Sequence, residues 1–566
     1  MPVRPTLLPA AASLTVLALC LGACSDPNAP RQAAAAPAAA ASRIVYPIAD
    51  YQEQGRGVPG GVLRVTAAVD PASLDFQVGA QTPAKWLGRL IYDNLVYLDD
   101  KGAITPWLAK SWEVSPDGKT YTFHLRQDVT FSDGAPFDAE AVRANLARIR
   151  DPATKAAMTT AYIAPYVDGV AKDRYTFEAH LSEPYGPFLN VLAQSWLGMM
   201  SPKALKEHPK GLADHPVGSG PFVVTRYARQ QGASFARRPD YHWAPDFVRH
   251  SGPAYLDRIE VTFMPEALTR YASLVAGQYD FTLDAPPQYA AALRREPDIV
   301  VNSRVNLGNP YRAITFNTSV APFSDVRVRQ AFARAVDREG ITRLVGFGEY
   351  TPTTGFLSAT TPYYDPHASA GIGYDPAAAN RILDAAGWTG RDAQGFRIRN
   401  GQRLSASVVV SETATSGPVL IALQSDARKI GFELKIEQVS IPQLTQRRMQ
   451  NNYEATGPGI WHTNTPDGLY IVYDSRNITT AKFTGQNISR LSDPVLDDLL
   501  LKARRSSDPK QLAELYSAAQ ARLAQVVPAV PLDENQSLMA YRREVNGVVY
   551  DTSHNTPFFT TAWIRR

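Results

Sequence analysis

The stretch YRAITFNTSVAPFSDVRVRQAFARAVDREG, from Tyr311 to Gly340, contains the pattern that decides the fold. It begins as a short strand with Ile314 and Phe316 on one face. Ser324 and Asp325 then supply oxygens that can cap a helix N-terminus. Apolar residues follow at helical spacing, namely Val328, Ala331, Phe332, Ala335 and Val336. We expect a strand, a crossing loop and a capped helix that Gly340 ends. This is either an ordinary strand–helix connection or a passage between two lobes.

Composition limits the classes of function. The 58 lysines and arginines nearly balance the 54 acidic residues, and a net charge of +4 is too small to indicate a nucleic-acid partner. Both cysteines, Cys20 and Cys24, lie near the N-terminus. The remainder of the chain therefore has no disulfide, thiolate metal site or cysteine nucleophile.

The N-terminus has the pattern of an exported, lipid-anchored protein. Arg4 precedes an apolar run from Leu7 to Leu21, which is too short to span a bilayer and fits a signal peptide. The run ends in Leu-Gly-Ala-Cys, which resembles a bacterial lipobox with Cys24 as the lipidated residue. A plain signal peptide that happens to contain Cys24 is the alternative. We expect a lipoprotein signal peptide at 1–24 and an Ala/Pro-rich tether at 25–60.

Beyond residue 60, predicted strands and helices alternate, which indicates an α/β protein. Two strands are expected around the turn Ser115-Pro116-Asp117-Gly118, followed by a tight turn and a helix from Asp138. The most distinctive pieces are Trp112, TYTFHLR at 120–126, FSDGAP at 131–136 and VGSGPF at 217–222. RPDY at 238–241, FNT at 316–318 and DAAGW at 384–388 follow.

Taken in order, these pieces resemble the dipeptide/oligopeptide/nickel-binding family of bacterial extracytoplasmic solute-binding proteins. The resemblance runs from about residue 61 to the end. It implies an α/β, two-lobed periplasmic-binding-protein-like fold (type II) with an extra subdomain in lobe I. Lobe I would comprise 61–315, lobe II 316–528, and 529–566 would return to lobe I. The crossing would make Asn317, Thr318 and Ser319 hinge residues.

The resemblance also suggests where a ligand binds. Family members that bind free peptides hold the α-amino group with an aspartate shortly after a tryptophan. Here Trp461 is followed by Asn464, whose neutral amide cannot give the charge-assisted bond of about 1.5–3 kcal/mol. Asp467 could substitute if the loop shifts. The arginine that some dipeptide binders use has no counterpart at 411–416.

The candidate ligand residues are therefore Gln77, Ser411, Glu412, Thr413, Trp461, Asn464, Asp467 and Tyr470. For each of them, an ordinary loop or core role is the alternative. A longer or modified peptide, held mainly through its backbone, and a non-peptide ligand such as a metal chelate both stay open.

The sequence is compatible to different degrees with a transport-coupled binding protein, a cell-envelope enzyme, and a receptor or chaperone. A transport-coupled binding protein would be a monomer without cofactor, working with an ABC permease and ATPase from the periplasmic face of a membrane. A cell-envelope peptidase or glycosidase is disfavoured because Gly218-Ser219-Gly220 lacks the spacing of a nucleophile elbow and no H-E-x-x-H occurs. We predict no catalytic residue and no metal site. A receptor or chaperone using the same site is not excluded by the sequence.

Overall fold

The structure, a computed structural model, describes residues 57–565 apart from 72, 80–84, 100–101, 311, 412–416, 460, 462, 484 and 552–554. The predicted signal peptide with Cys24, most of the tether, and the candidates Glu412 and Thr413 lie outside the described residues. Within the described part of the chain, no helix has both the length and the apolar character needed to cross a membrane.

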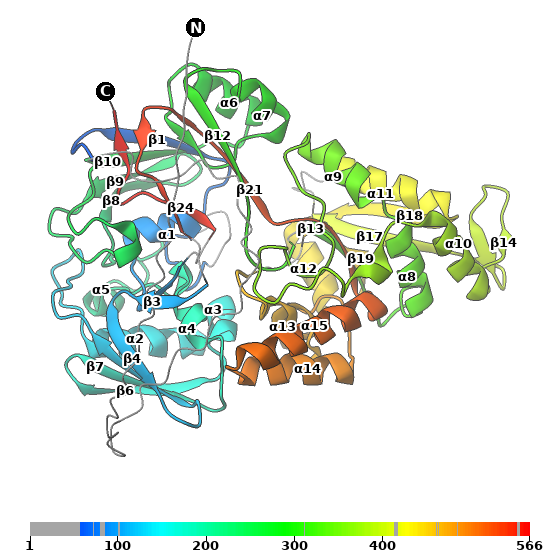
Figure 1. Cartoon of the computed structure of the whole chain (residues 1–566), viewed down its shortest axis with the longest axis horizontal. Helices are drawn as coiled ribbons and strands as arrows, with labels where there is room; N and C mark the ends of the chain where they lie inside the picture. Colours follow the sequence, from blue (N-terminus) through cyan, green and yellow to red (C-terminus); the bar gives the residue numbers. More distant parts are fainter. Residues whose placement is uncertain are drawn as a thin grey trace, which may run out of the picture. The chain divides into compact units, whose positions relative to one another are not determined.

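The first large sheet has seven strands in the order β12-β21-β11-β1-β10-β9-β8 (Figure 1). The strands β1, β10 and β11 run parallel. Inward residues such as Leu63 and Val65 are completely buried. The strands are β1 (Val62–Ala67), β8 (Phe222–Ala228), β9 (Gly232–Arg237), β10 (Arg258–Phe263), β11 (Phe281–Thr282), β12 (Ile299–Val305) and β21 (Gln536–Arg542). The helices beside it include α1 (Lys85–Ile91), α6 (Ala267–Val275) and α7 (Pro287–Leu293).

A four-stranded antiparallel sheet, in the order β4-β5-β7-β6, forms from residues between β1 and β8. The predicted hairpin around 115–118 is confirmed as its first two strands. Asp138 caps the following helix, since its Oδ1 accepts from Ala141 N at 3.0 Å. These elements are β4 (Ala109–Val114), β5 (Thr120–Leu125), β6 (Tyr166–Asp173), β7 (Thr176–Leu181), α2 (Ala139–Arg150), α3 (Ala157–Tyr162), α4 (Phe188–Leu192) and α5 (Pro202–Glu207).

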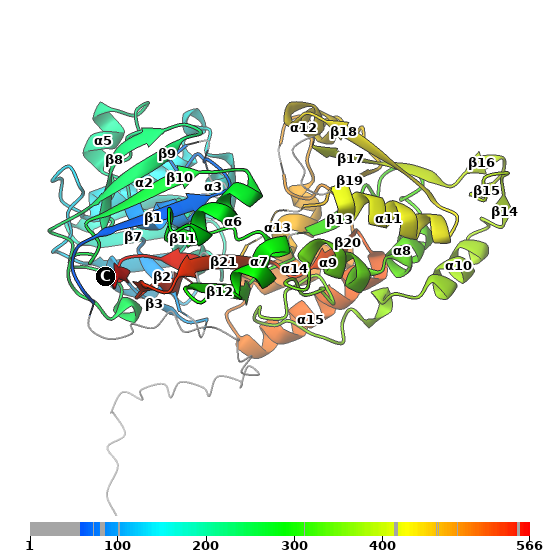
Figure 2. The same cartoon turned by 90° about the horizontal axis from the view of Figure 1, so that it is seen from above.

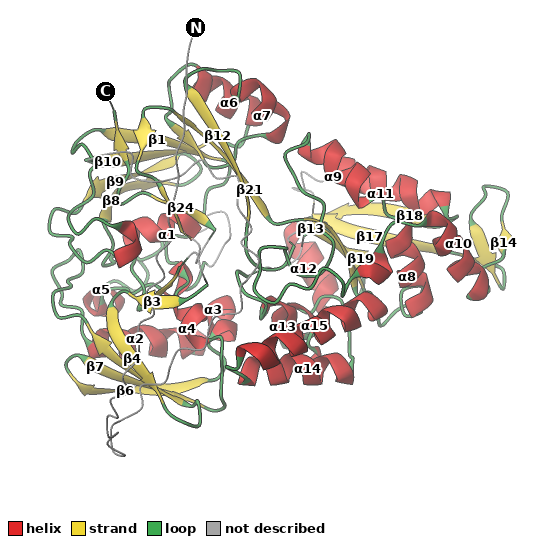
Figure 3. Ribbon diagram, in the orientation of Figure 1, coloured by secondary structure: helices red, strands yellow, loops and turns green. Residues whose placement is uncertain are grey.

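The second large sheet has five strands in the order β18-β17-β19-β13-β20, and α8, α11 and α12 pack against it (Figure 3). Its strands are β13 (Arg312–Phe316), β17 (Ser405–Ser411), β18 (Glu433–Val439), β19 (Ala455–Thr456) and β20 (Ala529–Asp533). Its helices are α8 (Val326–Ala335), α9 (Arg338–Gly346), α10 (Pro376–Ala385), α11 (Gly417–Lys429), α12 (Ile441–Met449), α13 (Gly468–Tyr473), α14 (Pro494–Arg505) and α15 (Pro509–Val526).

Shorter elements complete the described fold. The small strands are β2 (Val96–Leu98), β3 (Ile104–Pro106), β14 (Gly390–Arg391), β15 (Arg397–Arg399), β16 (Gln402–Arg403), β22 (Val545–Asn546), β23 (Val549–Asp551), β24 (Thr556–Phe558) and β25 (Trp563–Ile564). The 3-10 helix η3 (Ser195–Leu197) bears on the site below.

The opening stretch folds largely as its pattern predicts. Asp325 caps α8 by accepting from Arg327 N, and all five predicted stripe residues are buried. The prediction that Gly340 ends the helix is wrong. The chain turns extended at Val336, and Asp337 caps a second helix, α9, by accepting from Gly340 N at 2.8 Å. A new capping residue thus restarts the helix before the glycine is reached.

The chain changes sheets twice. It leaves β12 at Val305 and enters β13 at Arg312, which we call the first passage. It leaves β20 and enters β21 through 534–535, the second passage (Figure 2). We call the part built on the seven-stranded sheet the first region and the part at 312–533 the second region. The predicted lobe boundaries at 315/316 and 528/529 remain predictions. By sheet membership, β13 and β20 both belong to the second region.

Candidate functional site

Both passages connect the carboxyl edges of the two sheets. β12 is antiparallel to β21, and β21 is antiparallel to β11, so β12 runs with the parallel strands and ends at their carboxyl edge. In the second region β13 is antiparallel to β19, so it begins where β17, β18 and β19 end. Open α/β sheets bind ligands at this edge. From the topology, we therefore expect the ligand site to lie among the residues around the two passages.

The first passage is tied to the loop that carries most of the predicted ligand residues. Asn309 Nδ2 donates to Trp461 O at 2.8 Å, and Thr463 N donates to Asn309 Oδ1 at 3.2 Å. Gly308 has φ +108°, and a Cβ there would lie 1.5 Å from Thr463 O. Only glycine allows this close approach of two backbones.

Side chains of the first region contact the same loop. The Tyr162 and Trp461 ring centroids are 5.1 Å apart. Gln194 Nε2 lies 3.4 Å from both Thr463 Oγ1 and Asn464 Oδ1. Asn464 is buried and Trp461 is half-buried. The predicted residues Trp461, Asn464, Asp467 and Tyr470 thus lie on one segment at the junction of the two regions.

Asp467 already has a cation beside it. Its Oδ1 lies 2.9 Å from Arg504 Nε, although the two atoms miss hydrogen-bond alignment, and both side chains are buried. Burial raises the pKa of Asp467 to about 6, and the charge of Arg504 opposes that shift. The Arg504 guanidinium also lies 3.8 Å from the Tyr470 ring centroid and 4.5 Å from that of Tyr185. Arg504 therefore neutralises Asp467, the acid that could have bound a ligand's α-amino group in place of the expected aspartate.

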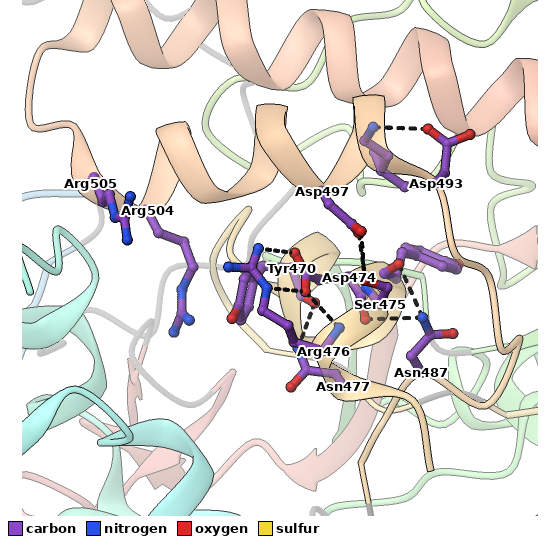
Figure 4. A network of polar contacts seen from close by, with 12 residues as sticks. Tyr470, Asp474, Ser475, Arg476, Asn477, Asn487, Asp493, Asp497, Arg504 and Arg505 are labelled. Atoms are coloured by element: carbon purple, nitrogen blue, oxygen red, sulfur yellow. Dashed lines mark hydrogen bonds and ion pairs between the residues drawn. The ribbon is translucent and has the colours of Figure 1, made fainter. Parts of the chain in front are cut away.

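Polar contacts hold the helix that begins after Asp467. Figure 4 shows Arg476 paired with the buried Asp474, at 2.8 Å from Nε and 2.6 Å from Nη2. Asn477 Nδ2 donates to Tyr470 O at 2.9 Å. Ser475 N donates to Asp497 Oδ1 of α14 at 2.9 Å. These contacts fix α13 on α14, which also supplies Arg504 (Figure 4).

Other predicted residues lie apart from this cluster. Gln77 is buried in the first region, where its Nε2 donates to Asn145 Oδ1 at 2.7 Å and its Oε1 accepts from Arg148 at 2.7 Å. These bonds occupy the side chain internally. Ser411 ends β17 at the carboxyl edge.

The predicted hinge residues form hydrogen bonds within the second region. Asn317 Nδ2 donates to Tyr453 O and Asn451 Oδ1, each at 2.8 Å, and Thr318 N donates to Ser489 O at 2.9 Å. Ser319 Oγ donates to Asn317 Oδ1 at 2.7 Å. Their hinge role stays a prediction, and the change of sheet itself occurs earlier, before β13 begins at Arg312.

A pocket of about 630 Å³ lies beside Thr318 and Ser319, but its charges are already satisfied. Arg522 pairs with Asp493 at 2.7 Å, and Arg329 donates to the backbone oxygens of Phe323, Val526 and Val527. We therefore place the candidate site at the junction and not in this pocket.

Sequence reasoning missed Arg448, which lies at the carboxyl edge of the second sheet. Its Nη2 donates to Thr456 Oγ1 at 2.8 Å at the end of β19, and its buried Nε has no hydrogen-bond partner among the described residues. Burial lowers the pKa of Arg448. It also missed Arg504, because an arginine late in a helix has no local signal that distinguishes a buried cation from a solvated one.

The chain matches the profile of the bacterial extracellular solute-binding proteins, family 5 Middle, over residues 103–480. It is 28% identical over 490 residues to the glutathione-binding protein GsiB of Escherichia coli O1:K1, covering 84% of this chain and 89% of that protein.

Solved structures share the fold. The periplasmic binding protein DppA of Helicobacter pylori, in complex with peptide STSA, has a TM-score of 0.75 and 26% identity, with 90% of this chain and 99% of DppA covered. NikA of Brucella suis, in complex with Fe(III)-EDTA, has a TM-score of 0.77 and 24% identity, with coverages of 89% and 100%. At that identity NikA supports the fold alone.

Proposed function

Because this chain belongs to the bacterial extracellular solute-binding proteins of family 5, we propose that it captures a peptide or peptide-like solute for an ABC permease and its ATPase. Proteins of this family bind solutes and are not enzymes, so the site needs only to recognise a solute. DppA was solved with a peptide, and GsiB is named for glutathione, which is itself a peptide.

The observation that carries this proposal is the position of the 461–470 segment. It lies against the first passage through Asn309 and against the first region through Tyr162. Trp461 offers an aromatic surface for a ligand backbone, and Arg448 offers a guanidinium N–H for a ligand carbonyl oxygen. In the described part of the chain, the backbone joins the two regions at the first and second passages. Closure about these passages would bury a solute at the carboxyl edges of the two sheets.

The charge of the site favours a ligand that does not depend on an ammonium group. Asp467 is neutralised by Arg504, and Asn464 is uncharged. A peptide held through its backbone and carboxylate fits this arrangement. So does a metal chelate with carboxylate arms, which is the second candidate; among the described residues, no cluster of His, Cys, Asp or Glu could hold a bare ion.

Native mass spectrometry of protein purified from its own host distinguishes the two candidates by the mass of the co-purified solute. A peptide mass is expected. A chelate mass would favour the alternative. Failure of peptide, chelate and sugar libraries to raise the unfolding temperature would contradict solute binding, and turnover of a substrate by the pure protein would indicate an enzyme instead.

The anchor is a separate part of the proposal. Cys24 in its lipobox pattern would carry the lipid that holds the protein on the periplasmic side of a membrane. The Cys24→Ala protein should then leave the membrane fraction. Cys20→Ala is the matched control and should stay in it. Unchanged membrane retention of Cys24→Ala would refute lipidation at that residue.

A further inference from the structure

A buried lysine without a partner begins α1. Lys85 is 8% exposed, and within the described part of the chain no hydrogen bond or ion pair reaches its Nζ. Burial lowers the pKa of Lys85 to about 8, and the charge of Asp551 partly opposes this. Burying a charge is unfavourable unless another group compensates it. The Lys85 ammonium could therefore bind an anion, because the side chains around it provide no ion-pair partner.

The neighbouring charges leave a positive excess. Arg89, one turn further along α1, pairs with Asp551, and both side chains are fully buried. Arg89 also donates to Ala193 O at 2.7 Å. Two cations thus share one carboxylate. The elements packed most closely on α1 are β8, β24 and η3, and none of these three contains an acidic residue.

The position of Lys85 connects it with the candidate site. Ser195 Oγ donates to Lys85 O at 3.0 Å. Gln194, the residue before Ser195, is the one that reaches Thr463 and Asn464. Lys85 therefore belongs to the part of the first region that meets the 461–470 segment.

We infer that Lys85 is an anion subsite for the solute, which accepts a ligand carboxylate from the first region. This inference rests on the proposed function, and it further specifies that the solute carries a carboxylate. A carboxylate at Lys85 would supply the counter-ion that the protein lacks, and the bond would be charge-assisted.

The test compares ligands that differ only in that carboxylate. The probes are the peptide STSA and its C-terminal amide, with glutathione as a second acid, measured by titration calorimetry. The variants are Lys85→Met, which keeps the length and removes the charge, and Lys85→Arg, which keeps the charge. The matched control is Lys203→Met, at an exposed lysine of α5.

The wild-type protein and Lys203→Met should bind the acid at least about tenfold more tightly than the amide. Lys85→Met should bind both forms alike, and Lys85→Arg should keep part of the preference. At pH 8, binding of the acid should take up protons in the wild-type protein and not in Lys85→Met, since an anion raises the pKa of the lysine.

Equal binding of acid and amide by the wild-type protein, or a preference that survives in Lys85→Met, overturns the inference and leaves solute binding intact. If neither form of any probe binds, the peptide function fails. In that case, the unfolding temperature of the ligand-free protein tests whether the charge of Lys85 is uncompensated. An uncompensated charge requires Lys85→Met to unfold at a higher temperature than the wild type, and an equal or lower temperature overturns the subsite as well.

Discussion

The two regions each bury a cation near their junction, and they treat it differently. In the second region Arg504 lies 2.9 Å from Asp467 and between the rings of Tyr470 and Tyr185. In the first region, the buried Lys85 has no hydrogen-bond or ion-pair partner among the residues that the structure describes. A buried charge with its counter-ion holds structure together, because removing either one strands the other. A buried charge without one is available to a ligand.

Removing the paired cation should have the largest effect on stability. Arg504→Leu would leave the buried Asp467 without its counter-ion, and we expect a loss of about 3–5 kcal/mol in the free energy of unfolding. Urea denaturation measures it. The control is Arg505→Leu, the next residue, whose pair with Glu183 is half-exposed and contributes about 1 kcal/mol or less. Equal losses in both variants would contradict a special role for Arg504.

A buried acid in the second passage, Glu534, should make the stability of the protein depend on pH. Glu534 is 5% exposed, and burial raises its pKa to about 7. The folded protein therefore keeps a proton that the unfolded chain loses above about pH 4.3. This stabilising contribution is complete below that pH and is lost as the pH rises through 7.

Glu534→Gln cannot titrate, so the wild type should lose up to about 3 kcal/mol relative to this variant between pH 5 and 8. Urea denaturation at each pH gives the difference. Glu339→Gln, at an exposed residue, should show the same pH dependence of the free energy of unfolding as the wild type. A pH dependence of Glu534→Gln that matches the wild type would refute the raised pKa.

Gly308→Ala should break the contact that the first passage makes with the 461–470 segment. The new Cβ would clash with Thr463 O, and φ at this residue is unfavourable for alanine. We expect a loss of about 1–3 kcal/mol, measured as a lower unfolding temperature. Gly371→Ala, where a Cβ meets nothing within 4 Å, should be nearly neutral. Similar behaviour of the two variants would argue against the tight approach.

The smallest expected effect is a change in ligand preference. Asn464→Asp would place a carboxylate at the position that aligns with the expected aspartate. Binding of a free-amino peptide relative to its N-acetyl form should improve about tenfold, as expected for a charge-assisted bond. Asn400→Asp, at an exposed residue between β15 and β16, is the control. An unchanged ratio would show that Asn464 does not face the ligand's amino end.

The sequence predicted the elements with strong local signals. The stripe from Val328 to Val336 and the cap at Asp325 were enough to find α8, because periodicity and capping are properties of neighbouring residues. The same local reasoning failed at Gly340, where Asp337 starts a new helix first. Ordered motifs indicated the family, and the profile match confirmed it.

The candidate site was only partly predictable. Trp461, Asn464, Asp467 and Tyr470 share one segment, so a motif could find them together. Arg504 and Lys85 could not be found in this way, because their roles depend on partners distant in sequence. Gln77 was predicted to bind the ligand because it follows the first strand. In the structure its side chain is instead hydrogen-bonded to Asn145 and Arg148.

By itself, the sequence determined the alternation of strands and helices, the start of α8 with its cap at Asp325, and the family, since each depends on short-range pattern. Only the tertiary structure decided which charges are compensated. Arg504 meets Asp467 across 37 positions of sequence, and Arg89 takes the carboxylate of Asp551 across 462. Pairing of buried charges is a matter of distance in space, and chain position does not encode that distance directly.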